Sequence, residues 1–108
     1  MGDLVLGEFE QLVLLALMRQ GNDAYGVPVC EDIAERTGRA VSLGAVYKTL
    51  ERLEAKGLLS SRFGEPTAER GGRRKKHYRL LAAGHRALKQ SLAGLRNMTE
   101  GLESDLKL

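Results

Sequence analysis

The sequence predicts a mainly α-helical domain with a β-hairpin before its last helix, an α+β fold. Three segments with helical spacing of apolar residues come first, two short extended runs follow, and a leucine-spaced segment ends the chain. The composition agrees: 43% of the residues are hydrophobic, only 5% are aromatic and none is Trp, which is typical of a small helical protein with an aliphatic interior. A chain of 108 residues is long enough for one domain with a modest core.

The first helix is expected over residues 7–21. Its apolar residues recur at the spacing of one helix face: Phe9, Leu12, Val13, Ala16 and Leu17. Further apolar residues between positions 14 and 18 widen this stripe, so we expect the helix to be buried on more than one side. A helix this apolar in so small a domain indicates a partner subunit, and Phe9 and Leu12 are the candidates for that contact.

A helix-turn-helix is predicted over residues 26–57. Its first helix begins near Gly26, because Pro28 is tolerated only in the first turn of a helix. Its second helix begins after Ser42, whose hydroxyl can cap a free backbone amide, and ends at Gly57. The buried stripe of this second helix is expected to contain Leu43, Val46, Leu50 and Leu53. The outward face is expected to contain Gly44, Ala45, Lys48, Thr49 and Arg52.

A hairpin with a long basic tip is predicted by two short runs on either side of a turn-rich segment. Residues 58–64 are extended in character, and residues 75–81 alternate in polarity. The connection is rich in Gly, and five cationic side chains fall between Arg73 and Arg79. A basic tail or a nuclear-localisation signal would also be cationic, but the Tyr-x-Leu alternation favours a folded strand. The residues expected to contact phosphates are Arg73, Arg74, Lys75 and Lys76.

The last segment, residues 82–108, is expected to form a long helix that pairs with a second copy of the chain. Its seam residues step by three and four positions, as in a coiled coil: Leu88, Leu92, Leu95, Thr99, Leu102 and Leu106. A seam this narrow favours dimerisation, and packing against its own domain is the alternative. We therefore divide the chain into a domain over residues 1–81 and a dimerisation helix over residues 82–108. The expected interface contains Phe9, Leu12, Leu88, Leu92, Leu95 and Leu102.

The net charge of +3 is unevenly distributed along the chain. Residues 1–35 carry one Arg and seven acids, residues 36–96 carry 15 Lys and Arg and four acids, and residues 97–108 carry one Lys and three acids. The middle segment therefore has a net charge of +11, which favours binding to a polyanion. An ordinary solvated surface with uneven charges is the alternative.

The sequence shows no sign of secretion, membrane insertion, catalysis or metal binding. The acidic N-terminus differs from a secretory signal, and the longest apolar run, Leu12–Met18, is too short to span a bilayer. A single Cys allows no internal disulfide, which fits a reducing cytoplasm. No phosphate-binding loop, nucleophile motif or paired acidic site is visible, so we expect neither an enzyme nor a cofactor. The residues Cys30, His77 and His85 lack the spacing of zinc ligands.

The order of these elements predicts a winged helix-turn-helix, in which the hairpin is the wing. The second helix of such a motif enters the major groove of DNA, and its N-terminal residues reach bases or backbone. Ser42 can donate to a phosphate, while Gly44 and Ala45 let the free amides of the helix approach an anion. The wing would lie beside the duplex and reach an adjacent minor groove or phosphates. The side chains expected to face the major groove are Lys48, Thr49 and Arg52.

The chain also resembles the PadR family of bacterial transcription regulators over nearly its whole length. The matching stretches are GEFEQLVLLAL, Tyr25-Gly26, SLGAVYKTLERLEAKGLL, GGRRKKHYRL and Gly84. The resemblance implies a dimeric winged-helix repressor of a short subclass, whose single C-terminal helix dimerises. It implies DNA contacts by Ser42, Gly44, Tyr47 and Lys48, a backbone contact by Tyr25, and a wing lined by Arg73, Arg74, Lys75 and Lys76.

Two positions and the absence of Trp qualify this resemblance. Tyr47 lies next to the inner stripe of its helix, so packing against the core is an alternative to DNA contact. Leu81 stands where the family commonly has Thr before the last helix, so a side-chain cap is not expected there. Some short members bind flat aromatic drugs between tryptophans, and this chain has no Trp, so such binding is not expected.

We therefore expect a cytoplasmic transcription regulator that binds double-stranded DNA as a homodimer on a pseudo-palindromic operator and acts as a repressor. A small-molecule effector would act by changing the angle between the terminal helices, but no residue identifies one. The alternative function is a winged-helix module for protein–protein interaction, whose basic face serves solubility or an acidic partner.

Overall fold

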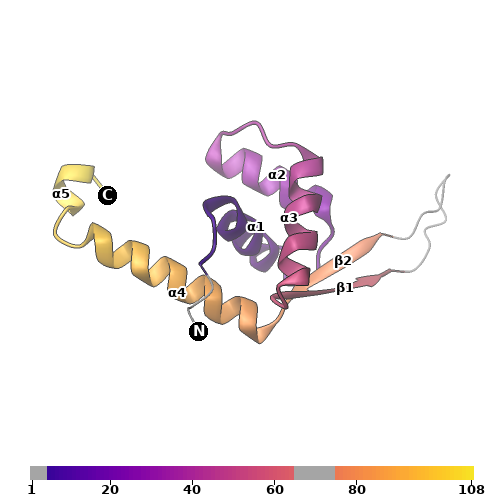
Figure 1. The fold of residues 1–108 in the computed structure, drawn as a ribbon. Helices are drawn as coiled ribbons and strands as arrows, with labels where there is room; N and C mark the ends of the chain where they lie inside the picture. The colour runs from indigo at the N-terminus through magenta and orange to yellow at the C-terminus, as the bar shows by residue number, and fades with distance from the viewer. Residues whose placement is uncertain (1–4, 65–74) are drawn as a thin grey trace.

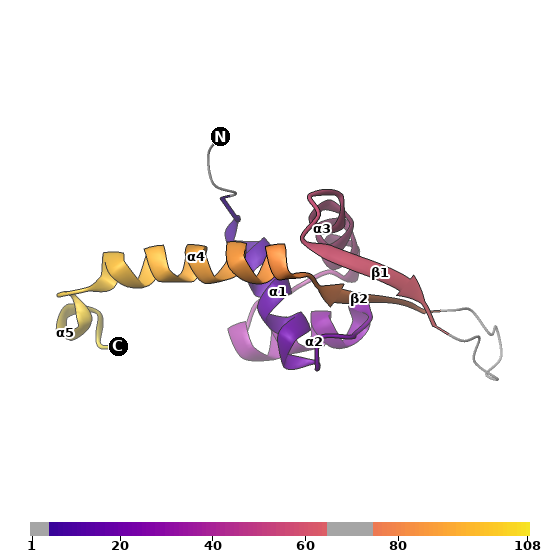
Figure 2. The same cartoon turned by 90° about the horizontal axis from the view of Figure 1, so that it is seen from below.

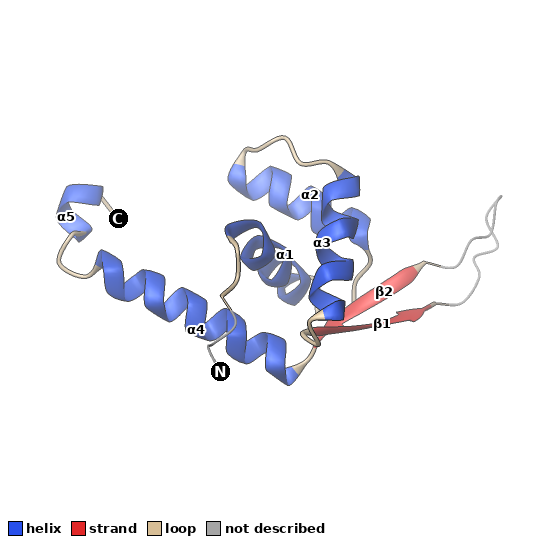
Figure 3. Ribbon diagram, viewed as in Figure 1, coloured by secondary structure: helices blue, strands red, loops and turns tan. Residues whose placement is uncertain are grey.

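The computed structural model describes residues 5–64 and 75–108, and its architecture is the expected winged helix-turn-helix. The first elements are the helices α1 (Glu8–Arg19), α2 (Gly26–Thr37) and α3 (Leu43–Ala55). They are followed by the strands β1 (Leu59–Phe63) and β2 (Lys76–Leu80) and by the helices α4 (Ala82–Thr99) and α5 (Glu103–Leu106). Helices α1 to α3 form a group from which the hairpin and α4 leave in opposite directions (Figure 1 and Figure 2). Figure 3 distinguishes the helices from the two strands of the wing.

Helices α2 and α3 begin and end close to the predicted residues. Gly38 follows α2 with a φ of 72°, a left-handed conformation that favours glycine. The Ser42 hydroxyl caps α3, because it accepts a hydrogen bond from the Ala45 amide at 3.1 Å. The start of α3 is therefore well defined, and the sequence-based prediction of its cap is confirmed.

The wing is tied to the connection between α1 and α2. Strands β1 and β2 pair antiparallel in a register that places Leu59 opposite Leu80. Ala24 bridges to Tyr78 on β2 through two backbone hydrogen bonds of 3.1 and 2.8 Å. The Asn22 side chain also holds β2, because its Oδ1 accepts a hydrogen bond from the Leu80 amide at 2.6 Å. The hairpin is thereby fixed relative to the helix-turn-helix.

The core is aliphatic and contains one fully buried aromatic side chain among the described residues, Tyr78. The three N-terminal helices contribute Val13, Leu14, Leu17, Val29, Ile33, Val46, Leu50 and Leu53. The wing and α4 contribute Leu58, Leu59, Leu80, Ala87 and Leu88. Burial of both Tyr78 and Leu80 confirms the alternation predicted for the return strand.

Helix α4 starts in close contact with the end of the helix-turn-helix, and a glycine makes this contact possible. A Cβ atom at Gly84 would overlap the carbonyl oxygen of Leu58 and would lie 2.6 Å from Cδ1 of Leu80. Only a residue without a side chain fits this space. Leu81 precedes α4 and makes no side-chain cap, as expected from its departure from the family pattern.

The C-terminal helix is present but shorter than the leucine spacing predicts. Helix α4 ends at Thr99, and a short helix, α5, follows it. Gly101 lies between them with a φ of 86°, a conformation that interrupts a right-handed helix. The spacing of the leucines continues across this break, so the expected seam does not lie on one straight helix.

Candidate nucleic-acid interface

The start of α3 presents small and cationic residues to solvent. Ser42, Gly44, Ala45 and Lys48 are all exposed, as expected from the sequence. A Cβ atom at Gly44 would meet no atom within 4 Å, so packing within the chain does not require glycine there. The first amides of a helix have no partner inside it, and they lie at the positive end of the helix dipole. This end of α3 is therefore suited to lie close to a phosphate.

Thr49 does not lie on the outward face of α3, and this expectation is wrong. It is only 2% exposed, and its hydroxyl accepts a hydrogen bond from Arg52 at 3.3 Å. Thr49 follows Val46 by three positions and precedes Leu53 by four, so it shares their buried face. Leu43 was expected on the buried face and is instead 38% exposed.

Arg52 and Lys56 turn toward α1 and pair with Glu10. The Lys56 Nζ lies 2.7 Å from Oε2 of Glu10, and the Arg52 Nε lies 3.5 Å from the same oxygen. The Gly7 amide donates to Oε1 at 2.8 Å. Burial raises the pKa of Glu10, but hydrogen bonds from Lys56 and Gly7, together with the charges of Lys56 and Arg52, outweigh it and lower the pKa overall. Sequence reasoning missed this carboxylate because Glu10 and Lys56 are 46 positions apart.

Tyr47 packs its ring on the start of α2. A Cβ atom at Gly26 would lie 2.6 Å from Cζ of Tyr47 and 3.0 Å from its hydroxyl oxygen, so only glycine leaves room for the ring. Tyr47 is half-buried, and the hydroxyl lies beside the first turn of α2. Packing against the domain is confirmed, and contact of the hydroxyl with DNA stays a prediction.

The lysines at the start of β2 make different contacts. Lys75 is exposed, and its Nζ lies 4.3 Å from the centre of the Tyr25 ring and 3.3 Å from the Tyr25 hydroxyl. The Lys76 Nζ lies 3.8 Å from Oε1 of Glu54 on α3, which partly offsets its charge. The structure thus places Tyr25, the expected contact to the DNA backbone, beside Lys75, one of the expected phosphate contacts of the wing. The other two expected wing residues, which lie outside the described residues, are Arg73 and Arg74.

An ion pair that sequence reasoning missed ties the wing to the connection between α1 and α2. Arg62 on β1 donates to Oδ2 of Asp23 at 2.6 Å. The His77 Nδ1 lies 3.8 Å from the other oxygen of Asp23, and the His77 ring meets the Tyr25 ring edge-on with 5.6 Å between centroids. These contacts join both strands to the connection between α1 and α2. No local pattern indicates them, because strand pairing alone makes these residues neighbours.

The residues expected to contact a second copy differ in how much they are covered within the chain. Leu88 is 3% exposed and belongs to the core, so its assignment to a dimer interface is wrong. Phe9, Leu12 and Leu92 are partly buried against the core. Leu95 and Leu102 are 60% and 46% exposed, and their contact with a partner stays a prediction.

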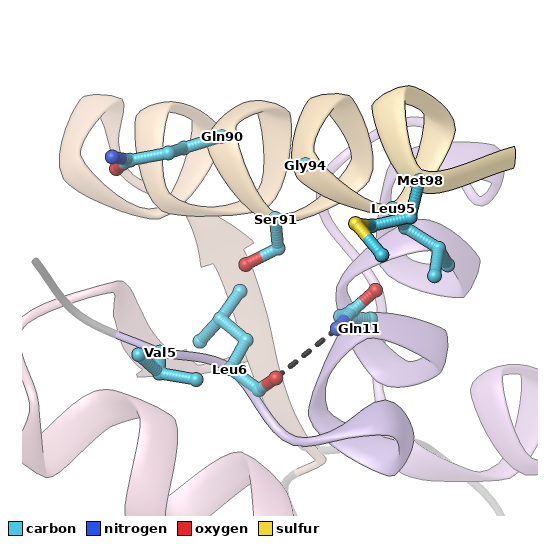
Figure 4. A pocket seen from close by; sticks show the side chains of 8 residues that line it. All are labelled: Val5, Leu6, Gln11, Gln90, Ser91, Gly94, Leu95 and Met98. Carbon is cyan, nitrogen blue, oxygen red and sulfur yellow. Dashed lines mark hydrogen bonds between the residues drawn. The ribbon is translucent and has the colours of Figure 1, made fainter. Parts of the chain in front are cut away.

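A groove of about 450 Å³ lies between α4 and the segment that leads into α1. It is lined by Val5, Leu6, Gln11, Gln90, Ser91, Gly94, Leu95 and Met98. Figure 4 shows Leu95 and Met98 pointing from α4 toward Gln11 on α1. Val5 and Met98, which sequence reasoning left out, are also largely exposed. This face of α4 therefore carries apolar surface that the described residues leave uncovered.

The remaining candidate residues do not assemble into a metal site. Within residues 5–64 and 75–108, no group of three or more His, Cys, Asp or Glu side chains is placed to hold a metal ion. Cys30 is half-buried, and its thiol donates to the Val41 carbonyl at 3.5 Å. In the same part of the chain, no helix combines the length and the apolar character needed to cross a membrane.

Comparisons with known proteins agree with this architecture. The family model described as the transcriptional regulator PadR-like family matches residues 14–90. The chain is similar to the crystal structure of a PadR family transcription regulator from Clostridium difficile R20291, with 26% identity, a TM-score of 0.75, and coverage of 93% of this chain and 99% of that chain. It is also similar to a PadR family transcriptional regulator from Eggerthella lenta DSM 2243, with 28% identity, a TM-score of 0.69, and coverage of 92% and 86%. No curated protein matches the chain.

Proposed function

The chain belongs to the PadR-like family of transcriptional regulators, and from this premise we propose that it is a homodimeric repressor that binds a pseudo-palindromic operator. It would read double-stranded DNA with α3, and it would act in the cytoplasm. The observation that carries the proposal is the exposed start of α3, where small residues and a cation surround the first helix amides, of which Ser42 caps that of Ala45. Such a surface fits a phosphate and the floor of the major groove.

The proposed contact surface combines the start of α3 with the wing. Lys48 is the first cation after the N-terminus of α3, where side chains reach base edges most easily. The other proposed contacts are Ser42, Gly44, Ala45 and Tyr47 on the helix, Tyr25 before α2, and Arg73, Arg74, Lys75 and Lys76 on the wing. Thr49 is left out because it is buried, and Arg52 is left out because Glu10 holds its guanidinium.

We propose that two copies pair through the uncovered face of α4. Leu95 and Met98 are exposed there and Leu102 is exposed just beyond the end of α4, and exposed apolar residues that gather in one region favour an interface. Antiparallel pairing would bring the acidic end of one copy, residues 100–105, close to the basic first half of the other α4. The two α3 helices would then reach half-sites about 34 Å apart, one turn of the duplex.

The salt dependence of binding separates this function from the alternative of a protein-interaction module. Affinity for a duplex from the region upstream of the coding sequence is measured by fluorescence anisotropy over a range of KCl concentrations. If each subunit neutralises about 3–4 phosphates, log K falls with log salt at a slope of about −5 to −7. A slope near zero would exclude the proposed DNA binding and favour the protein-interaction module.

Sequence specificity and symmetry are tested by a footprint on the same region. Two protected half-sites, one helical turn apart, are expected on the operator, and a scrambled duplex should bind more weakly. A single protected half-site, or equal affinity for the scrambled duplex, would contradict the homodimeric operator-binding proposal.

A further inference from the structure

One carboxylate, that of Glu10, is the shared partner of two cations, Arg52 on α3 and Lys56 at its C-cap. Lys56 and Arg52 both approach Oε2, at 2.7 and 3.5 Å. Glu10 is only 7% exposed, and an ionised carboxylate at this depth needs cationic partners because it has lost most of its hydration. The Lys56–Glu10 pair, in which Lys56 also donates a hydrogen bond at 2.7 Å, is therefore stronger than the ion pairs that form on an open surface.

Glu10 is itself held in place from the side of α1. The Gly7 amide donates to its Oε1 at 2.8 Å, and Glu10 lies in the first turn of α1. The carboxylate is therefore not free to follow Arg52 or Lys56 toward a ligand on the other side of α3. Either cation would have to leave Glu10, or share its N–H donors with it, in order to bind a phosphate.

The cations along α3 consequently differ in their availability. Lys48 is exposed and forms no ion pair with any described residue. Arg52, four positions later, pairs with Glu10 and also donates to the Thr49 hydroxyl at 3.3 Å. Its side chain keeps 56% of its surface exposed, so a phosphate beside α3 could reach Arg52 only in competition with Glu10.

We propose that Glu10 is a positioning residue that withholds Arg52 and Lys56 from DNA, and that it thereby limits how many phosphates α3 neutralises. This inference rests on the proposed DNA binding. Phosphate contacts strengthen binding to every sequence alike, whereas contacts with bases discriminate between sequences. By holding two cations, Glu10 keeps sequence-independent affinity low and leaves discrimination to residues nearer the start of α3.

The test compares salt slopes of binding for full-length variants on the same operator and scrambled duplexes. Glu10→Gln keeps an oxygen for the Gly7 amide but removes the charge that holds the cations. We expect a slope steeper by about 2–4 for the dimer, since each newly neutralised phosphate contributes about 0.9, and a smaller ratio of operator to scrambled affinity. Glu35→Gln, at an exposed acid on α2, makes the same change in net charge and should leave the slope unaltered.

A second pair of variants decides the inference even if Glu10→Gln does not fold. Arg52→Gln should leave the slope unchanged, because Arg52 does not touch DNA in the native protein, whereas Lys75→Gln, at an exposed wing lysine proposed to contact phosphate, should flatten it by about 2 for the dimer. An equal slope for Glu10→Gln and Glu35→Gln would overturn the inference alone, and so would a flattening by Arg52→Gln equal to that by Lys75→Gln. Absence of duplex binding by the unmodified chain would overturn the proposed function, and this inference with it.

Discussion

Replacing Gly44 by Ala should stabilise the folded chain and weaken its binding to DNA. The two effects have opposite signs because the chain itself does not need a glycine at this position. A Cβ atom there would meet no atom within 4 Å, so the added methyl group causes no clash. Gly is a poor helix residue because it loses more backbone freedom on folding than any other residue.

The magnitudes follow from the helix and from the proposed contact. Gly44→Ala in α3 should raise the free energy of unfolding by about 0.5–1 kcal/mol. On DNA, the methyl group would keep the first amides of α3 from a phosphate. Loss of one hydrogen bond to a charged group costs about 1.5–3 kcal/mol, which corresponds to a roughly 10- to 100-fold lower affinity.

Thermal unfolding and anisotropy titration on the operator duplex measure the two effects separately. Equal or tighter DNA binding by Gly44→Ala would refute the reasoning that the start of α3 approaches the backbone of DNA. A lower Tm would refute the account of the open space around Gly44.

Three further predictions address the fold, the DNA contacts and the response to acid. Gly84→Ala should lower the free energy of unfolding by about 1–3 kcal/mol, because a Cβ atom there overlaps backbone; an unchanged Tm in thermal unfolding would contradict this. Lys48→Ala should alter the sequence preference found by selection from random duplexes, whereas the Arg74→Ala, Lys75→Ala double variant should weaken binding to all sequences alike; the reverse pattern would contradict these roles. The pKa of Glu10 is lowered from 4.5, so this group stabilises the fold above that pH and the contribution is lost as the pH falls through the folded-state pKa. The Glu10→Gln variant should therefore lose less stability below pH 4.5 than the native chain does. The measurement is the midpoint of unfolding as a function of pH in the acid range.

The order of the main elements and the ends of α2 and α3 could be predicted because they depend on residues close together in the chain. Pro28 places the start of α2, Ser42 caps α3 through its own first turn, and Gly38 ends α2. The alternation in the return strand likewise reports which side of one short strand is buried. The family pattern added Tyr25 as an expected DNA contact, which local signals do not identify.

Contacts between distant elements could not be predicted in the same way. The pairing of Arg52 with Glu10 depends on the angle at which α3 crosses α1. The spacing of residues within either helix does not indicate this angle. Thr49 was misplaced because the edge of a helical stripe is uncertain by one residue, which is enough to exchange a buried position for an exposed one. Leu88 was misplaced because apolar spacing shows that a residue is covered but not which surface covers it. The break at Gly101 was missed because the leucine spacing continues across it.

The tight fit between Gly84 and the Leu58 carbonyl has a mechanical consequence. Helix α4 has 18 residues and is about 27 Å long at 1.5 Å per residue, and it is anchored at this one end. A tilt of α4 by about 10° about this contact would displace its C-terminal end by about 5 Å. That shift is larger than the spacing of about 3.4 Å between neighbouring base pairs. In the proposed dimer, the direction of α4 would set the distance between the two α3 helices. That direction is fixed at a contact where even one methyl group finds no room.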